Sequence, residues 1–266
     1  MLKTRIITAA VLIALLSLVL FALPPVATVV LVTLMVLAGA WEWAGFMRLT
    51  GRLSRLAYVG GIALCLALAW LIAASATGQL MLLGVATAWW LVALAWIVLA
   101  PQRATALSAG VAGVLALAPA WVALVRLWQL PHGTEWVLFA LLLVWAADIG
   151  AYFAGRWCGR RRLAPLVSPG KTWEGVWGAL AASALVAVAG SQWFGVPLAP
   201  FVPLCLAAVV FSIVGDLTES LLKRFAGLKD SGTLFPGHGG VMDRIDSLTS
   251  ALPVLLFGLL SFGVVR

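Results

Sequence analysis

Residues 80–100 read LMLLGVATAWWLVALAWIVLA and contain no charged side chain. A helix of about 20 apolar residues crosses the hydrocarbon core of a bilayer, so this stretch predicts a transmembrane helix. Eight further runs of similar character predict the other spans, at 6–23, 26–46, 56–74, 106–125, 136–154, 175–194, 203–222 and 247–265. The span at 106–125 is the least regular, because Pro119 interrupts it. The expected fold class is all-α, a polytopic membrane helix bundle with about nine transmembrane helices.

The composition of the chain also indicates a membrane protein. Hydrophobic residues make up 64% and charged residues 10% of its 266 residues, whereas soluble domains have about 45–50% apolar and about 25% charged residues. The net charge of +8 is spread over short gaps between apolar runs, with no basic domain that carries a platform for base stacking. We therefore expect no nucleic-acid partner. Cys65, Cys158 and Cys205 form neither a CxxC pair nor a zinc pattern, so no disulfide is expected.

Basic residues lie before the first span and in every second gap after it. Because positively charged loops are retained in the cytoplasm, this bias places the N-terminus in the cytoplasm and the C-terminus outside. The apolar stretch after MLKTR is longer than the about 7–15 residues of a signal-peptide core, so we expect it to be retained as the first helix. The residues that carry the bias are Lys3, Arg5, Arg48, Arg52, Arg55, Arg103, Arg156, Arg160, Arg161, Arg162, Lys171, Lys223, Arg224, Lys229 and Arg244.

Acidic residues are scarce and unevenly distributed. The chain contains nine Asp and Glu residues, and seven of them lie between positions 148 and 246. This distribution predicts two functional parts within one integrated membrane domain. Residues 1–130 are expected to form N-terminal scaffold helices, and residues 131–266 a C-terminal catalytic half.

Residues 216–246 read DLTESLLKRFAGLKDSGTLFPGHGGVMDRID and hold five acidic and four basic residues in thirty-one positions. The spacing of Asp216, Glu219, Ser220 and Lys223 puts these side chains on one face of a helix, at the cytoplasmic end of the eighth span. An ionised carboxylate in a bilayer costs about 2.5–3.5 kcal/mol even on insertion scales. Such residues therefore normally face a polar cavity and have a partner.

Asp243 and Asp246 are three residues apart just before the ninth span, so they are also expected to face one way. Carboxylates that converge from two helix ends, with lysines and arginines nearby, suit Mg²⁺, which prefers oxygen ligands and keeps waters and substrate phosphates in its shell. The glycine-rich piece at 236–240 lets backbone N–H groups turn toward an anion. The role of His238 stays open between a phosphate donor, a general acid and a structural residue.

A second polar cluster, ADIGAYFAGRWCGRRRLAPLVSPGKTWEG, spans residues 147–175. Its GKT tripeptide suggests a Walker loop, but Pro165 stands where that pattern needs glycine, and no strand is expected before it. The P-loop interpretation is therefore rejected. What remains is Asp148 at the end of the sixth span, an arginine-rich loop, and Ser168 and Lys171 before the seventh. Its cations suit either phosphate contacts on a nucleotide or lipid headgroup or retention of the loop in the cytoplasm.

The C-terminal run resembles the signature of the phosphatidate cytidylyltransferase family, S-x-φ-K-R-x4-K-D-x-[GSA]-x2-φ-P-x-H-G-G-φ-x-D-R-φ-D, in which φ is apolar. Residues 220–246 fill every specified place, and the upstream GDLTES resembles the family's G-D-x-x-E-S. The SPGKTWEG segment at 168–175 resembles S-P-K-K-T-x-E-G, with Gly170 in place of a lysine. The DIGAY stretch resembles T-D-x-x-A-Y, with Ala147 in place of threonine. The first 130 residues match only in hydropathy.

This resemblance implies the reaction of CTP with phosphatidate to give CDP-diacylglycerol and pyrophosphate, a step of phospholipid biosynthesis. It implies a Mg²⁺-dependent nucleotidyltransferase that is assisted by a monovalent cation such as K⁺ and works as a homodimer. The enzyme is expected among the lipids of the bacterial inner membrane, with its active site at the cytoplasmic face. The residues that match the family's metal ligands are Asp216 and Asp243. The expected catalytic residues are Asp216, Lys223, Asp243 and Asp246. The expected substrate-binding residues are Asp148, Ser168, Lys171, Ser220, Arg224, Lys229, Asp230, His238, Gly239, Gly240 and Arg244.

Three alternatives stand beside this interpretation. A transporter would use the buried acids as an ion path, but it would more often show helices broken at mid-membrane. An enzyme of the CDP-alcohol phosphotransferase type would carry D-G-x2-A-R-x8-G-x3-D-x3-D, which this sequence lacks. A cytidylyltransferase that acts on another lipid phosphate is distinguished only by substrate assays.

Overall fold

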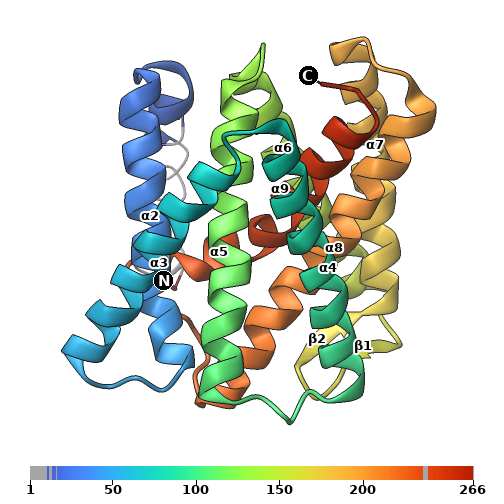
Figure 1. The fold of residues 1–266 in the computed structure, drawn as a ribbon. Helices are drawn as coiled ribbons and strands as arrows, with labels where there is room; N and C mark the ends of the chain where they lie inside the picture. The colour runs from blue at the N-terminus through green and yellow to red at the C-terminus, as the bar shows by residue number, and fades with distance from the viewer. Residues whose placement is uncertain (1–10, 12–13, 16, 236–238, 266) are drawn as a thin grey trace.

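The computed structural model describes residues 11, 14–15, 17–235 and 239–265, and nearly all of its regular elements are helices. Eight of the described helices are long and apolar enough to cross a membrane, which confirms the expected membrane helix bundle. Of the expected span at 6–23, residues 6–10, 12–13 and 16 lie outside the described part of the chain, and residues 11, 14–15 and 17–21 are helical. The eight are α2 (Pro25–Phe46), α3 (Arg52–Ile72), α4 (Ala76–Leu99), α5 (Ala106–Gln129), α6 (Gly133–Cys158), α7 (Trp173–Phe194), α8 (Leu198–Ala226) and α9 (Met242–Ser261) (Figure 1).

Several helices begin before the apolar runs that predicted them, because the helical backbone continues past the hydrocarbon core. Polar side chains then cap the exposed ends. Ser75 accepts a hydrogen bond of 3.0 Å from the backbone N–H of Gly78 at the start of α4, which satisfies one of the free N–H groups of that first turn. Pro119 does not end α5, which continues to Gln129. A proline removes one backbone hydrogen bond, and neighbouring helices can compensate for that loss within a membrane bundle.

A short β-hairpin joins α6 to α7. Strands β1 (Arg162–Ala164) and β2 (Ser168–Thr172) pair antiparallel, with Arg162 opposite Thr172 and Ala164 opposite Ser168. Thr172 also caps α7, because its hydroxyl accepts a hydrogen bond of 3.1 Å from the backbone N–H of Gly175. The hairpin was not expected from the sequence, and it places the GKT tripeptide on a strand.

The connections between helices alternate between the two ends of the bundle. The α2–α3, α4–α5 and α8–α9 connections lie with the hairpin at the lower end in Figure 1, whereas the α3–α4, α5–α6 and α7–α8 connections lie at the upper end. This alternation is the arrangement that the charge bias requires, since Arg52, Arg103, Arg161 and Lys229 all fall at or beside the lower connections. The side of the membrane that this end faces stays a prediction.

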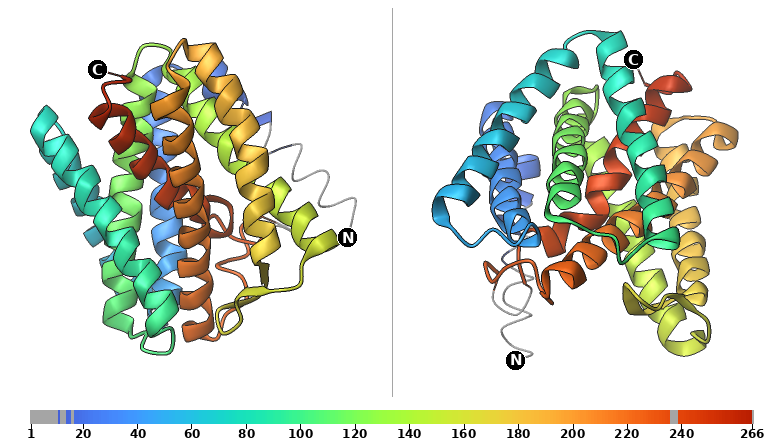
Figure 2. Two further views of the ribbon diagram at one scale, coloured as in Figure 1. Left: turned by 90° about the vertical axis from the view of Figure 1, so that its right-hand side faces the viewer. Right: turned by 60° about the horizontal axis from the view of Figure 1, so that its bottom comes forward.

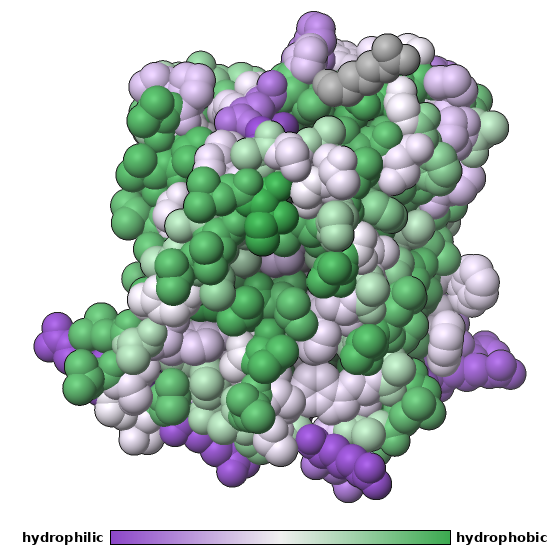
Figure 3. Space-filling view, viewed as in Figure 1, coloured by the Kyte–Doolittle hydropathy of each residue, from purple (hydrophilic) through white to green (hydrophobic). Residues whose placement is uncertain are grey.

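The lateral surface of the bundle is apolar. Large hydrophobic side chains such as Leu64, Val98 and Leu185 are exposed on it. In Figure 3 apolar residues cover the middle of the molecule, and strongly hydrophilic residues gather at the ends. This distribution is typical of a protein whose sides contact lipid tails and whose ends contact headgroups and water.

Glycines allow the helices around the site to approach closely. A Cβ atom added at Gly150 on α6 would meet the backbone of Gly178 on α7, so these two helices run side by side above the hairpin (Figure 2). Small residues at such contacts are characteristic of membrane helix packing. Helix α9 crosses the middle of the bundle and packs on α8, α5 and α4. The lower end of α9 therefore meets the lower end of α8 inside the protein.

Candidate active site

The acidic residues of α8 and α9 are brought together by a close contact of these two helices. Gly215 permits it, because a Cβ atom there would lie 2.7 Å from the carbonyl oxygen of Asp246. Helix α9 begins at Met242, so Asp243 and Asp246 lie in its first turns. The ninth span was expected to begin at 247, but the helix begins five residues earlier, so both aspartates belong to α9 and do not precede the span. The apolar run marks only the part of α9 that lies deeper in the bundle.

Asp243 is held by four donors. Its Oδ1 accepts a hydrogen bond of 2.7 Å from Lys223 Nζ. Its Oδ2 accepts hydrogen bonds from the backbone N–H groups of Ser231 (2.9 Å) and Gly240 (2.8 Å) and from the Ser231 hydroxyl (2.8 Å). Gly239 has a φ of 80°, and a Cβ atom there would collide with the Asp243 carboxylate, so this turn requires glycine. The sequence predicted that the glycine-rich connection turns backbone N–H groups toward an anion. At Gly240 the group that accepts the N–H is the carboxylate of Asp243.

The expected polar face of α8 is confirmed. Lys223 Nζ lies 3.4 Å from Glu219 Oε1, one turn away on the same helix, and the Ser220 hydroxyl donates a hydrogen bond of 3.4 Å to Asp216 Oδ1. Glu219 is 1% exposed, and within the described part of the chain neither of its carboxylate oxygens accepts a hydrogen bond. Because a buried carboxylate is costly unless it has a partner, the Lys223 ammonium group supports Glu219, which was not among the expected catalytic or binding residues.

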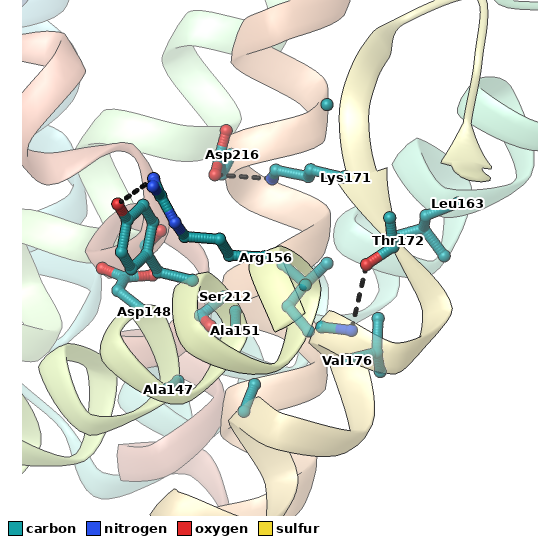
Figure 4. Close-up of a pocket in the computed structure, with 17 residues that line it drawn as sticks. Ala147, Asp148, Ala151, Arg156, Leu163, Lys171, Thr172, Val176, Ser212 and Asp216 are labelled. Carbon is teal, nitrogen blue, oxygen red and sulfur yellow. Dashed lines mark hydrogen bonds and ion pairs between the residues drawn. The ribbon is translucent and has the colours of Figure 1, made fainter. Parts of the chain in front are cut away.

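A cavity of about 390 Å³ opens at the same end of the bundle, between α6, β2, α7 and α8. Lys171 on β2 and Asp216 on α8 point toward each other across it, with 2.5 Å between Nζ and Oδ2 (Figure 4). Asp148 lies on the α6 wall, and Ser247 brings α9 to the lining. Three of the expected site residues, which come from three separate segments, therefore meet in one cavity.

Two cavity residues had no assigned site role. Arg156 and Tyr152 line the cavity from α6, and Arg156 Nη1 donates a hydrogen bond of 3.1 Å to the Tyr152 hydroxyl (Figure 4). Arg156 was expected only as one cation of the arginine-rich segment, whose charges suit either phosphate contacts or retention in the cytoplasm. Its spacing of four residues from Tyr152 predicts that the two share a helix face, but spacing does not show that the face is turned to the hairpin.

The remaining expected substrate-binding residues do not line the cavity, or lie outside the described residues. Ser168 opens β2 and is partly buried, and His238 lies outside the described residues. The other four are exposed, on the last turn of α8, on the α8–α9 connection and at the start of α9: Arg224, Lys229, Asp230 and Arg244. The roles of these six residues stay predictions.

The donor set of the site suits a hard divalent cation. No three acidic, histidine or cysteine side chains in the described part of the chain are arranged to hold a metal by themselves. Mg²⁺ is usually bound through one or two carboxylates together with substrate phosphates and waters, so a complete protein cage is not required. The buried carboxylate of Glu219 lies beside that of Asp246, which in turn lies near Asp216. Such a group of carboxylate oxygens is the type of ligand that a hard divalent cation prefers.

The expected sharing of one metal by Asp216 and Asp243 stays a prediction. In the structure Asp216 contacts Lys171, whereas Asp243 contacts Lys223 and the α8–α9 connection. Each carboxylate is thus paired with its own lysine. A metal that both aspartates bind would have to share them with, or displace, these two ammonium groups.

A comparison with known proteins identifies the chain. The profile of the cytidylyltransferase family matches residues 3–262. The chain belongs to the cytidylyltransferase family. It is 43% identical over 266 aligned residues to the protein named phosphatidate cytidylyltransferase from Pseudomonas aeruginosa, covering 96% of this chain and 95% of that protein. It is 38% identical to the protein of that name from Haemophilus influenzae, covering 95% and 96% of the two chains. With that of Brucella suis it shares 47% identity over 135 residues, 48% of each chain.

Family membership extends what the motifs alone indicated. The first 130 residues matched the family only in hydropathy, yet the family profile and two relatives cover nearly the whole chain. Membership of this family also indicates that the protein is an enzyme and not a transporter. The described helices agree with this, since α2 to α9 are continuous and are not paired half-helices that meet at mid-membrane.

Proposed function

We propose that this protein is a phosphatidate cytidylyltransferase, which transfers the cytidylyl group of CTP to phosphatidate and releases pyrophosphate. The observation that carries the proposal is the cavity at one end of an apolar bundle, in which Lys171 meets Asp216. A polar cavity at that level lets a water-soluble nucleotide meet a lipid whose acyl chains stay in the bilayer. The names of the relatives that are 43% and 38% identical agree with this assignment.

The proposed reaction needs little proton transfer. An oxygen of the lipid phosphate attacks the α-phosphorus of CTP and forms a new P–O bond. The bond between the α-phosphorus and the bridging oxygen breaks, and its electron pair leaves with pyrophosphate. The second pKa of a phosphate monoester is about 6, so the attacking group is already ionised at neutral pH. The main difficulty is the approach of two anions, and fixed positive charge in the site reduces it.

The residues of the site supply that charge and hold it in place. Lys171 and Arg156 line the cavity, where they would contact phosphate oxygens, while Lys223 offsets part of the negative charge of Asp243 and Glu219. Asp216 and Asp243 would hold the magnesium ion. When bound, Mg²⁺ neutralises phosphate charge and stabilises the departing pyrophosphate. A monovalent cation such as K⁺ belongs to the same proposal.

The proposal also covers location and assembly. We place the protein in a bacterial inner membrane with the hairpin end in the cytoplasm, where CTP is available. The bacterial sources of the relatives and the clustering of basic residues at that end support this. A homodimer is proposed from the family resemblance.

The test is a direct assay of the purified protein in mixed micelles. Incubation with CTP, phosphatidate and Mg²⁺ should yield CDP-diacylglycerol and pyrophosphate in equal amounts. A parallel reaction with an ether-linked lipid phosphate distinguishes the lipid substrate. Absence of pyrophosphate release with phosphatidate, from protein that is monodisperse in detergent, would overturn the proposed function.

A further inference from the structure

Glu42 is a buried carboxylate on α2, in the half of the chain that the charge distribution assigned to scaffold. Its side chain accepts hydrogen bonds from the backbone N–H groups of Val241 (3.0 Å) and Met242 (2.9 Å) and from the Ser231 hydroxyl (3.0 Å). These partners are 189 to 200 residues away in sequence. In Figure 2 the α8–α9 connection lies beside the lower end of α2, as these bonds require.

The contact anchors the start of α9. Val241 and Met242 carry two of the N–H groups that a helix leaves without internal partners at its N-terminus, and the N-cap residue Val241 has no side chain that could bond them. Glu42 supplies the acceptors from another helix, and its negative charge interacts favourably with the helix dipole. Asp243 is the next residue of that first turn. Glu42 therefore fixes the backbone from which Asp243 projects.

A second route connects Glu42 to Asp243 through Ser231. The Ser231 hydroxyl oxygen lies 3.0 Å from Glu42 Oε2 and 2.8 Å from Asp243 Oδ2. A hydroxyl has one proton to donate, so the two carboxylates share it. The backbone N–H of Ser231 donates to Asp243 as well. Displacement of the Glu42 carboxylate would thus release the serine that binds Asp243 twice.

The connection is also shaped around Glu42. Cβ atoms added at Gly232 or at Gly240 would collide with the Glu42 carboxylate. Gly240 in turn donates its N–H to Asp243. Two glycines therefore make room for Glu42, and one of them is a direct partner of Asp243.

We propose that Glu42 is a positioning residue for the cytidylyltransferase site, which holds Asp243 against Lys223 through Ser231 and the first turn of α9. This inference rests on the proposed function for its activity measurements. It assigns to α2 a part in turnover besides support of the bundle. A role limited to stability predicts the opposite behaviour, in which the folded fraction of a Glu42 variant turns over at the wild-type rate.

Glu42→Gln is the primary variant. Whichever way the amide turns, its NH₂ group faces the N–H of Val241 or Met242, so one bond to the start of α9 becomes a contact of two donors. A misplacement of about 1 Å in a catalytic group can cost about 10²-fold in rate, so we expect kcat to fall by about 10- to 100-fold. The KM for CTP should change by less than about threefold, because Glu42 does not line the cavity.

Ser231→Ala and the double variant test the route. Ser231→Ala removes the shared hydroxyl but leaves the bonds of Glu42 to α9, and it too should lower kcat. If both residues act on Asp243 together, the double variant should be about as active as the poorer single variant. Multiplied losses in the double variant, or a wild-type kcat in either folded single variant, would overturn the proposal. Thr105→Ala, which removes the capping box that Thr105 forms with Ser108 at the start of α5, is the control for lost stability and should keep the wild-type kcat.

Hydrogen exchange supplies a readout that needs no substrate. The N–H groups of Ser231 and Gly240 bind Asp243 and not Glu42. In Glu42→Gln both should exchange faster, by about tenfold or more, while α5 keeps its protection. Unchanged exchange at these two amides would overturn the positioning role. An inactive wild-type protein would overturn the proposed function alone, since the exchange result does not depend on turnover.

Discussion

Asp243→Asn separates the structural from the chemical role of one carboxylate. If the amide nitrogen replaces Oδ2, it faces two backbone N–H groups and the Ser231 hydroxyl. If it replaces Oδ1, it faces the Lys223 ammonium group, 2.7 Å away in the native protein. The second orientation keeps three of the four hydrogen bonds, so it should be preferred. The variant then loses its charge-assisted bond to Lys223.

The expected cost in stability follows from that single bond. The side chains of Lys223 and Asp243 are 14% and 10% exposed, and a hydrogen bond to a charged group at such a site contributes about 1.5–3 kcal/mol. The variant should therefore fold, with a lower thermal midpoint. Its turnover should fall by about 10²-fold or more, because the anionic group that the proposed Mg²⁺ site requires is gone. The four hydrogen bonds of Asp243 make a measurable loss of stability part of this expectation.

The assay is CTP-dependent formation of CDP-diacylglycerol over a magnesium titration, with folding followed by size exclusion in detergent and by thermal unfolding. Glu135→Gln is the matched control, since Glu135 is an acid near the opposite end of the bundle that accepts a hydrogen bond of 2.7 Å from Trp193. It should leave kcat unchanged. Full activity of Asp243→Asn at low magnesium would refute the metal assignment.

Three further predictions use the same preparations. Lys171→Ala removes the partner of Asp216 and should lower kcat/KM by about tenfold. This loss should be smaller than that of Asp243→Asn, because Arg156 lines the same cavity and would still meet the phosphates. A loss as large as that of Asp243→Asn would contradict the prediction. Arg161→Ala should leave CTP turnover nearly unchanged, since the backbone N–H of Arg161, and not its guanidinium, binds Glu174. A large loss in CTP turnover would contradict this and would show a substrate contact. A reporter at the C-terminus should be found outside the cytoplasm and one within 156–174 inside it; the same side for both would contradict nine spans.

The helices could be predicted well because lipid imposes one demand on the whole chain. Every spanning segment must satisfy its own backbone and present apolar side chains, so hydropathy alone indicated α2 to α9. Helix ends were less predictable, because helices continue into the headgroup region where hydropathy falls. That is why α9 begins at Met242 and not at 247. The hairpin gave no signal, since β1 has only three residues.

The site could be predicted within one helix but not between helices. Spacing correctly placed Asp216, Ser220 and Lys223 on one face of α8, because a turn of helix has a fixed geometry. Which carboxylate each lysine would meet was not predictable. The pairing of Lys171 with Asp216 depends on the hairpin, and that of Lys223 with Asp243 depends on how α9 lies against α8.

Glu42 makes contacts that the distribution of charges along the sequence does not reveal. A carboxylate within an apolar helix costs about 2.5–3.5 kcal/mol, so its presence in α2 already indicated a partner. No local pattern names that partner, because Ser231 and Met242 lie 189 and 200 residues away. The prediction that residues 1–130 act as scaffold rested on the scarcity of acids there. A single acid that bonds the start of α9 is enough to couple the two halves of the chain.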